Sequence, residues 1–267
     1  MAPTVSLHLL IALYVAVFGL LVGSYLNVVI YRVPLGLSTV LPRSRCPACN
    51  APIRALDNLP VLSFLLLGGK CRSCGTGISW RYPAIEAFTS LVLVGCFLAF
   101  GLRPQMLVAA VFACLMIVLA MIDVDHMILP DRITWPGIAL GFLGHAMLVV
   151  LLHLPWNHML EPLGGALLGG GMTLAIYGLW WLIRREEGLG LGDAKMLALI
   201  GAFLGWKAML VAFFFAVLTG SIVGIVAMRR SGQGMQTRLP FGAFLAFGGL
   251  LALFAAPAII DFYLQFL

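Results

Sequence analysis

Long apolar runs alternate with short polar links along most of the chain. A helix needs about 20 residues to cross the hydrocarbon core of a bilayer. Seven runs approach or exceed this length, at roughly 5–30, 83–101, 105–122, 133–153, 160–183, 207–228 and 240–264. A shorter apolar stretch lies at about 194–205. The pattern predicts an all-α polytopic membrane protein, with about eight transmembrane helices when the short stretch is counted.

One long polar segment, at about 32–82, interrupts the apolar pattern. The run before it has no small-residue cleavage site after it, so we interpret that run as a retained helix and not as a removed signal peptide. We therefore expect three parts: a first transmembrane helix at 1–31, an insertion at 32–82, and a transmembrane bundle at 83–267.

The composition excludes a soluble domain. Of the 267 residues 62% are hydrophobic and only 10% are charged, and the mean hydropathy is +1.08. The net charge of +6 does not indicate nucleic acid, because Lys and Arg also mark the cytoplasmic loops of membrane proteins.

The positive charges indicate an orientation. With eight crossings and the insertion in the cytoplasm, 14 of the 16 Lys and Arg residues lie on the inner side, and Arg103 and Lys207 lie outside. Seven crossings would move three arginines to the outside: Arg229, Arg230 and Arg238. The bias therefore favours eight crossings with both termini outside.

The short stretch at 194–205 cannot span a bilayer by itself. Twelve residues of helix reach about 18 Å, whereas the hydrocarbon core is about 30 Å thick. We expect this helix to start below the membrane surface, to lie in thinned bilayer, or to enter a water-filled recess.

The insertion contains two Cys-x-x-Cys pairs. Cys46 and Cys49 form "CPAC", and Cys71 and Cys74 form "CRSC", with 21 residues between the pairs. Two such pairs supply four thiolates to one tetrahedral Zn²⁺. Disulfides or a redox pair are the alternatives, and a reducing cytoplasm disfavours disulfides. We predict a closed, structural zinc site.

Two of the ten acidic residues stand at the ends of apolar segments that the topology brings to the same membrane edge. Asp123 follows the apolar run 105–122, and Asp193 begins the short stretch. Two close carboxylates cannot both ionise easily, so one can act as an acid while the other activates water. The alternative is a pair of unrelated helix-end acids.

The other polar features have simpler interpretations. We expect Asp131 to N-cap the following helix, Asp125 to be a solvated or supporting acid, and Glu86 to lie in the first turn of its helix. The run "GGALLGGG" at 164–171 favours close helix packing over nucleotide binding, because no strand precedes it.

The chain resembles the bacterial type IV prepilin peptidases (leader peptidase/N-methyltransferase), membrane aspartic proteases of the Gly-x-Gly-Asp class. The matching motifs are the two Cys-x-x-Cys pairs, "GSYLNVVIYRVP" (23–34), "DNLPVLSFLLLGGKC" (57–71), "ISWRYPAIEAFT" (78–89), "IDVDHMILPD" (122–131) and "GLGDAKMLALIGAFLGW" (190–206).

The resemblance implies a function and a pair of catalytic residues. The family's catalytic aspartates correspond to Asp123 and Asp193. The family removes the short basic leader of prepilins and type II secretion pseudopilins, after a glycine, at the cytoplasmic face of the bacterial inner membrane. It then methylates the new N-terminus with S-adenosylmethionine. The alternatives are a transporter with a zinc-bound cytoplasmic loop and proton-relay carboxylates, or a related intramembrane protease with another substrate.

Overall fold

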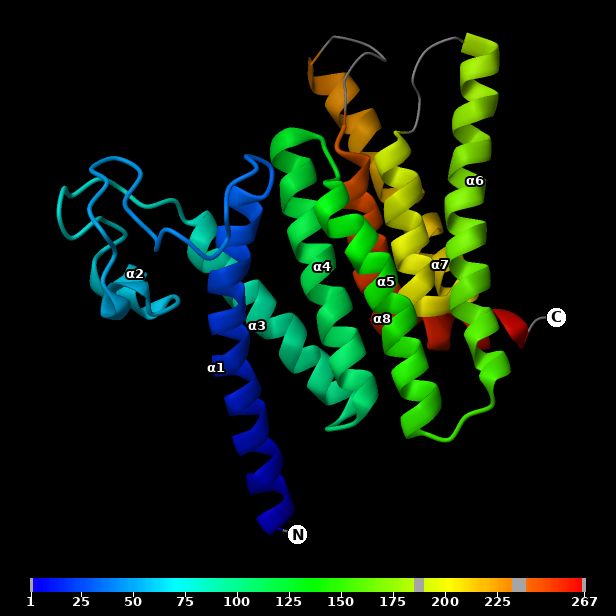
Figure 1. Ribbon diagram of the computed structural model, residues 1–267, viewed down its shortest axis with the longest axis horizontal. Coiled ribbons are helices and arrows are strands. Elements are labelled where there is room, and N and C mark those ends of the chain that lie inside the picture. Colours follow the sequence, from blue (N-terminus) through cyan, green and yellow to red (C-terminus); the bar gives the residue numbers. More distant parts are fainter. Residues whose placement is uncertain (1, 185–189, 232–238, 266–267) are drawn as a thin grey trace. The chain divides into compact units, whose positions relative to one another are not determined.

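A computed structural model describes residues 2–184, 190–231 and 239–265 of the chain. The regular elements of these ranges are all helical (Figure 1): α1 (Ala2–Arg32), η1 (Ala55–Asn58), α2 (Leu62–Leu66), α3 (Arg81–Phe100), α4 (Pro104–His126), α5 (Asp131–Leu151), η2 (Trp156–Met159), α6 (Leu160–Arg184), α7 (Leu191–Ser231) and α8 (Phe241–Leu264). Seven of them are long and apolar enough to cross a membrane. The predicted all-α membrane fold is confirmed.

The chain forms two compact units, Met1–Met106 and Leu107–Leu267. The first contains α1, the insertion and α3. The second contains the remaining helices, apart from the first residues of α4. The functional division that we predict from the sequence, at 1–31, 32–82 and 83–267, stays a prediction.

In the first unit, α1 and α3 pack backbone against backbone. A Cβ atom added to Gly19 would lie 2.7 Å from Cα of Ser90, and one added to Gly23 would lie 2.7 Å from Cα of Glu86. The Ser90 hydroxyl also donates to the carbonyl of Ala16 at 2.8 Å. Small residues and interhelical hydrogen bonds are the usual means by which helices associate in lipid, because burial of apolar surface supplies little driving force there.

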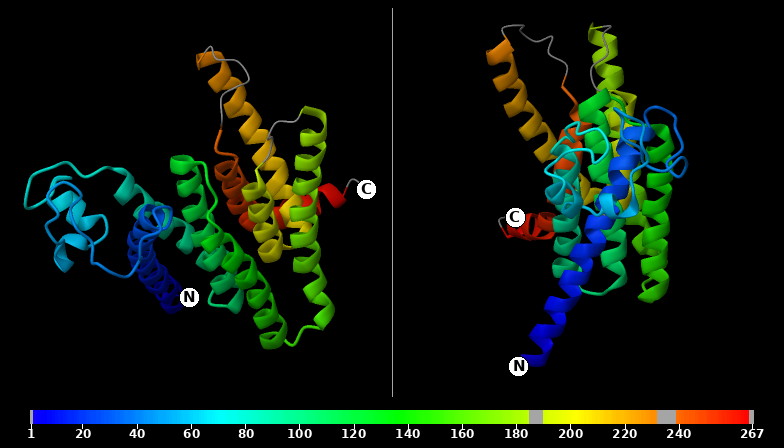
Figure 2. Two further views of the ribbon diagram at one scale, coloured as in Figure 1. Left: turned by 45° about the horizontal axis from the view of Figure 1, so that its top comes forward. Right: turned by 90° about the vertical axis from the view of Figure 1, so that its left-hand side faces the viewer.

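The chain of the second unit reverses its direction within α7, at Gly205. This residue has φ 77° and ψ 170°, outside the helical region, in a conformation that glycine adopts without steric penalty. The first arm begins at one end of the unit, and the second arm returns from Gly205 toward that same end (Figure 2). They correspond to the predicted short stretch, 194–205, and to the predicted run 207–228. With α7 divided at this reversal, the described residues hold eight long or short apolar helical segments, the number predicted when the short stretch is counted.

The short first arm of α7 forms the core of the second unit. Its residues Met196, Leu197, Leu199 and Ile200 are completely buried. Neighbouring helices surround it: Phe203 packs on Phe112 of α4 with 5.3 Å between ring centroids, and Leu199 lies against Gly137 of α5. A helix that is apolar on all sides belongs in such a core, so protein and not lipid covers this segment.

Glycines let α6 approach the first arm of α7. A Cβ atom on Gly165 would collide with the carbonyl of Gly201, and one on Gly169 would lie 2.7 Å from the carbonyl oxygen of Leu197. The glycine-rich run is therefore a packing surface, as the sequence favoured. Because Gly165 lies opposite Gly201 and Gly169 opposite Leu197, the two helices run antiparallel.

We predict that Gly165→Ala lowers the thermal stability of the detergent-solubilised protein. Alanine adds about 1 kcal/mol of helix propensity over glycine, but the new methyl group overpacks a backbone contact, which costs about 1–3 kcal/mol. The matched control is Gly164→Ala, because a Cβ atom there meets no atom within 4 Å. A Gly165→Ala protein that melts at or above the temperature of the Gly164→Ala protein would contradict the packing.

Candidate functional site

Asp123 lies in the last turn of α4 and is 5% exposed. The helix ends just after it because Met127 adopts φ 52° and its amide donates to the carbonyl of Asp123 at 2.8 Å. The side chain is held from a different helix. Its Oδ2 accepts a hydrogen bond from the amide of Ala243, in the first turn of α8, at 3.0 Å, and the Gly242 amide also donates to this carboxylate.

Asp193 lies in the first turn of α7. Its Oδ2 accepts a hydrogen bond from the amide of Gly190 at 2.9 Å, and its own amide donates to the carbonyl of Gly190 at 3.0 Å. An acid three positions after the N-cap residue commonly makes this return bond to that residue's amide. The charge of Asp123 acts electrostatically on Asp193. The end of α4 and the start of α7 lie at the same end of the second unit (Figure 1), so Asp123 and Asp193 lie at that end, and their catalytic pairing stays a prediction.

Measured along the helix axes, α6 extends well past the level of the two aspartates. The antiparallel register of Gly165 with Gly201, and of Gly169 with Leu197, places Thr173 at the level of Asp193. From Thr173, α6 continues to Arg184, which adds about 16 Å at 1.5 Å per residue. The three arrangements that we expected for the short stretch in the bilayer stay predictions.

The polar residues around the pair correct one prediction. Asp131 is not an N-cap: α5 begins at Asp131 itself, Pro130 occupies the cap position, and no side chain caps this end. The Asp131 carboxylate instead accepts a hydrogen bond from Nζ of Lys195. Lys195, which lies two residues after Asp193, therefore binds Asp131. Asp125 is exposed.

The four predicted zinc ligands form one cluster in the first unit. The Sγ atoms of Cys46, Cys49, Cys71 and Cys74 all lie within 4.8 Å of one another, and those of Cys46 and Cys74 are 3.8 Å apart. A tetrahedron with Zn–S bonds of about 2.3 Å has sulfur atoms about 3.8 Å apart. The cluster could hold a metal ion, and its donor set fits zinc.

The two Cys-x-x-Cys segments have the same backbone conformation. In the first, the Cys46 amide donates to Ala51 and the Asn50 amide donates back to Cys46; Cys71, Thr76 and Gly75 repeat these bonds in the second. The fifth residue is left-handed in both, with φ 56° at Asn50 and 72° at Gly75. Each segment is thus a turn that presents two sulfur atoms on one side.

Local hydrogen bonds favour the thiolate at two of the four cysteines, Cys74 and Cys46. At Cys49 the amide of Ala51 is outweighed by the neighbouring cysteines and by burial, which raise the pKa of that thiol to about 11. The hydroxyl of Thr76, 3.3 Å from the sulfur of Cys74, and the Thr76 amide lower the pKa of that thiol to about 6. The amides of Cys49 and Ala48 lower the pKa of the Cys46 thiol. Metals bind the thiolate form.

An ion pair stabilises the insertion. The guanidinium of Arg72 donates to both carboxylate oxygens of Asp57 and lowers the pKa of that carboxyl.

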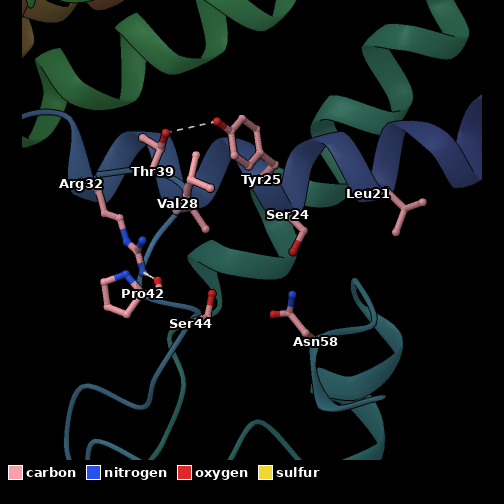
Figure 3. A pocket seen from close by; sticks show the side chains of 10 residues that line it. Leu21, Ser24, Tyr25, Val28, Arg32, Thr39, Pro42, Ser44 and Asn58 are labelled. Carbon is pink, nitrogen blue, oxygen red and sulfur yellow. Dashed lines mark hydrogen bonds between the residues drawn. The ribbon is translucent and has the colours of Figure 1, made fainter. Parts of the chain in front are cut away.

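A cavity of about 400 Å³, lined by both polar and apolar side chains, lies between α1 and the insertion (Figure 3). The Tyr25 hydroxyl donates to Oγ1 of Thr39 at 3.3 Å. The guanidinium of Arg32 donates to the carbonyls of Ser38 and Pro42, at 2.8 Å each. Arg32 therefore fastens the start of the insertion to the end of α1, and we assign it a structural role.

Comparison with known proteins identifies the family. The Bacterial Peptidase A24 N-terminal domain matches residues 17–100, and the Type IV leader peptidase family matches residues 110–225. A prepilin leader peptidase/N-methyltransferase of Aeromonas salmonicida is 35% identical, over 94% of this chain and 93% of its own length. The chain belongs to the type IV leader peptidase family.

Other family members with the same description show similar identities. The protein of Pseudomonas putida is 36% identical, over 88% of each chain. That of Myxococcus xanthus is 40% identical over 84% of this chain, and the match spans 65% of the Myxococcus protein's length. No solved structure matches the chain.

Two residues of this family member acquire roles that we did not foresee. Glu86, which we expected in a first helical turn, is the sixth residue of α3. It is 8% exposed, and its Oε2 accepts a hydrogen bond from the amide of Val61 at 2.8 Å, so it ties the insertion to α3. Gly242 contributes to the site although α8 lies beyond the matched residues 110–225. The sequence offered one signal for this role: Gly242 follows Pro240 at the start of a predicted apolar helix.

The left-handed position in each Cys-x-x-Cys turn leads to a prediction. Gly75→Val should weaken metal binding and protease resistance of the insertion, because a left-handed conformation costs a β-branched residue about 1–2 kcal/mol or more. Gly75→Asn is the matched control, since asparagine occupies the equivalent position 50 and tolerates this conformation. Metal affinity by competition with a chelator measures both variants. Equal affinities for the two would contradict the equivalence of the turns.

Proposed function

We propose that the chain is a prepilin peptidase whose catalytic pair is Asp123 and Asp193. The observation that carries this proposal is that one side chain, Leu129, lies against both Gly192, the neighbour of Asp193, and Gly242, which adjoins the Asp123 carboxylate. The names of the relatives, prepilin leader peptidase/N-methyltransferase, support the same activity. The substrates are then prepilins and pseudopilins, which carry a short basic leader before an apolar helix.

The pair would hydrolyse the leader's peptide bond through an activated water. One carboxylate, ionised, takes a proton from water, and the resulting hydroxide attacks the carbonyl carbon of the leader's last residue, a glycine. The other carboxyl, protonated, gives its proton to the carbonyl oxygen. Transfer of a proton to the amide nitrogen then lets the C–N bond break. Because the two aspartates have opposite roles at each step, neither can replace the other.

The active site and the insertion would lie on the cytoplasmic side of the bacterial inner membrane. The excess of Lys and Arg in the links on that side supports this orientation. It also places the site where a basic leader, held in the cytoplasm by its own charges, presents its scissile bond. The bilayer is thus a partner in recognition, because it fixes the depth of the substrate's apolar helix.

The four cysteines would bind one structural Zn²⁺. All four ligands come from the protein, so no coordination position is open for water or substrate. The ion would hold the two turns of the insertion together, and its binding free energy would contribute to folding of that segment. Hydrolysis is assigned to the aspartates.

The second activity, methylation of the new N-terminus, would use S-adenosylmethionine as methyl donor. The description of the relatives as N-methyltransferases supports this activity. The cavity beside α1 has the volume of a small-molecule site, but its one cation, Arg32, directs its guanidinium to backbone carbonyls. We therefore assign no residues to the methyl donor.

We predict that Asp123→Asn and Asp193→Asn each lower the cleavage rate by at least about 100-fold, which is the lower range of acid–base contributions. Both proteins should still insert, because removing a charge near the bilayer makes insertion easier. Asp125→Asn is the control and should keep substantial activity. Mass analysis of a prepilin incubated with each solubilised variant measures cleavage. Full cleavage by the Asp193→Asn protein would end the proposal of a pair.

We predict one zinc ion per chain. Cys71→Ser should remove it, because three thiolates hold the ion less tightly, and should make the insertion sensitive to proteases. Cys114→Ser is the matched control, since Cys114 lies in α4 outside the cluster, and this variant should retain the ion. Elemental analysis of the purified proteins decides, and active, folded protein without zinc would contradict the assignment.

A further inference from the structure

The loop between α4 and α5 contacts residues that adjoin each of the two aspartates. After the left-handed residue Met127, the side chain of Leu129 lies against two glycines from distant parts of the sequence. A Cβ atom on Gly192 would lie 3.2 Å from Cβ of Leu129, and one on Gly242 would lie 3.1 Å from its Cδ1. Leu129 therefore separates the start of α7 from the start of α8.

Each glycine adjoins one aspartate. Gly192 precedes Asp193 in the chain. Gly242 lies directly on the carboxylate of Asp123: an added Cβ atom would be 2.9 Å from its Oδ2 and 3.0 Å from its Cγ. The next residue, Ala243, donates the 3.0 Å hydrogen bond to the same Oδ2. The first turn of α8 thus contacts Asp123 on the oxygen that accepts this bond.

We infer that Gly192, Leu129 and Gly242 form a positioning cluster that sets the separation and orientation of Asp123 and Asp193. This inference rests on the proposed catalytic pair. The three residues do not touch the substrate in this account. They fix where the two carboxylates stand, and a misplacement of about 1 Å can lower a rate about 100-fold.

The two glycines act differently, and this difference can be tested. A methyl group at position 242 meets the Asp123 carboxylate first, whereas the three atoms nearest to one at position 192 all belong to Leu129. Leu129→Ala removes Cδ1 and Cγ, which lie 3.3 and 3.6 Å from the methyl group at position 192, but keeps Cβ at 3.2 Å. It should therefore relieve the second clash in part and leave the contact with the Asp123 carboxylate in place. A role in folding alone would not produce this pattern, because both methyl groups are equally large.

The experiment measures kcat and KM for prepilin cleavage, with the thermal midpoint of each protein. Gly242→Ala should lower kcat about 100-fold with KM changed by less than about twofold, and Leu129→Ala should not restore it. Gly192→Ala should lower kcat less, and adding Leu129→Ala should recover part of the loss. Gly171→Ala is the matched control and should keep the parent kcat, because a Cβ atom there meets no atom within 4 Å.

The outcomes separate this inference from the proposed function. A Gly242→Ala protein with the parent kcat overturns the cluster, even if Asp123→Asn is inactive. If Gly242→Ala does not fold, the Gly192→Ala and Leu129→Ala pair decides, and failure of Leu129→Ala to recover any activity overturns the cluster. If Asp123→Asn and Asp193→Asn both remain fully active, the proposed catalytic pair itself is wrong.

Discussion

The reversal of the chain at Gly205 is the constraint on which the site depends. Without it, α7 would be a single helix of 41 residues, about 60 Å long at 1.5 Å per residue and far longer than a bilayer is thick. The left-handed φ of Gly205, which other residues adopt only at a cost, divides it into two arms. The short first arm then places Asp193 at the end of the unit where the last turn of α4 carries Asp123.

Backbone contacts hold this arrangement together. Glycines on α5 and α6 let these helices approach the first arm of α7, at Gly141 and Gly165 respectively. Close packing is the main attraction available between helices in lipid. Polar groups are satisfied in the same way: the buried carboxylate of Asp123 and the half-buried carboxylate of Asp193 each accept a hydrogen bond from a backbone amide, and an unsatisfied polar group in a bilayer would cost several kcal/mol. The same packing that supports the fold therefore also orients the carboxylates.

Much of this architecture could be predicted from the sequence, because membrane helices are long and their apolar pattern is direct. The spans, the cysteine cluster and the placement of Asp123 and Asp193 at one end of the unit follow from run lengths, spacing and charge. What could not be predicted depends on contacts between distant segments. Nothing near Asp131 indicates that it pairs with Lys195 and not with its own helix end. The contact of Gly242 with Asp123 joins positions that are more than a hundred residues apart, and no local pattern encodes it.

The sidedness of α7 tests the central claim most directly. Single cysteines at Leu191, Lys207 and Arg229 can be labelled with a membrane-impermeant maleimide in right-side-out and inverted vesicles, with the parent chain as background. The reversal at Gly205 predicts that cysteines at 191 and 229 react from one side and that a cysteine at 207 reacts from the other. Labelling of 191 and 229 from opposite sides would show that α7 crosses once, and would contradict the arrangement that brings the two aspartates together.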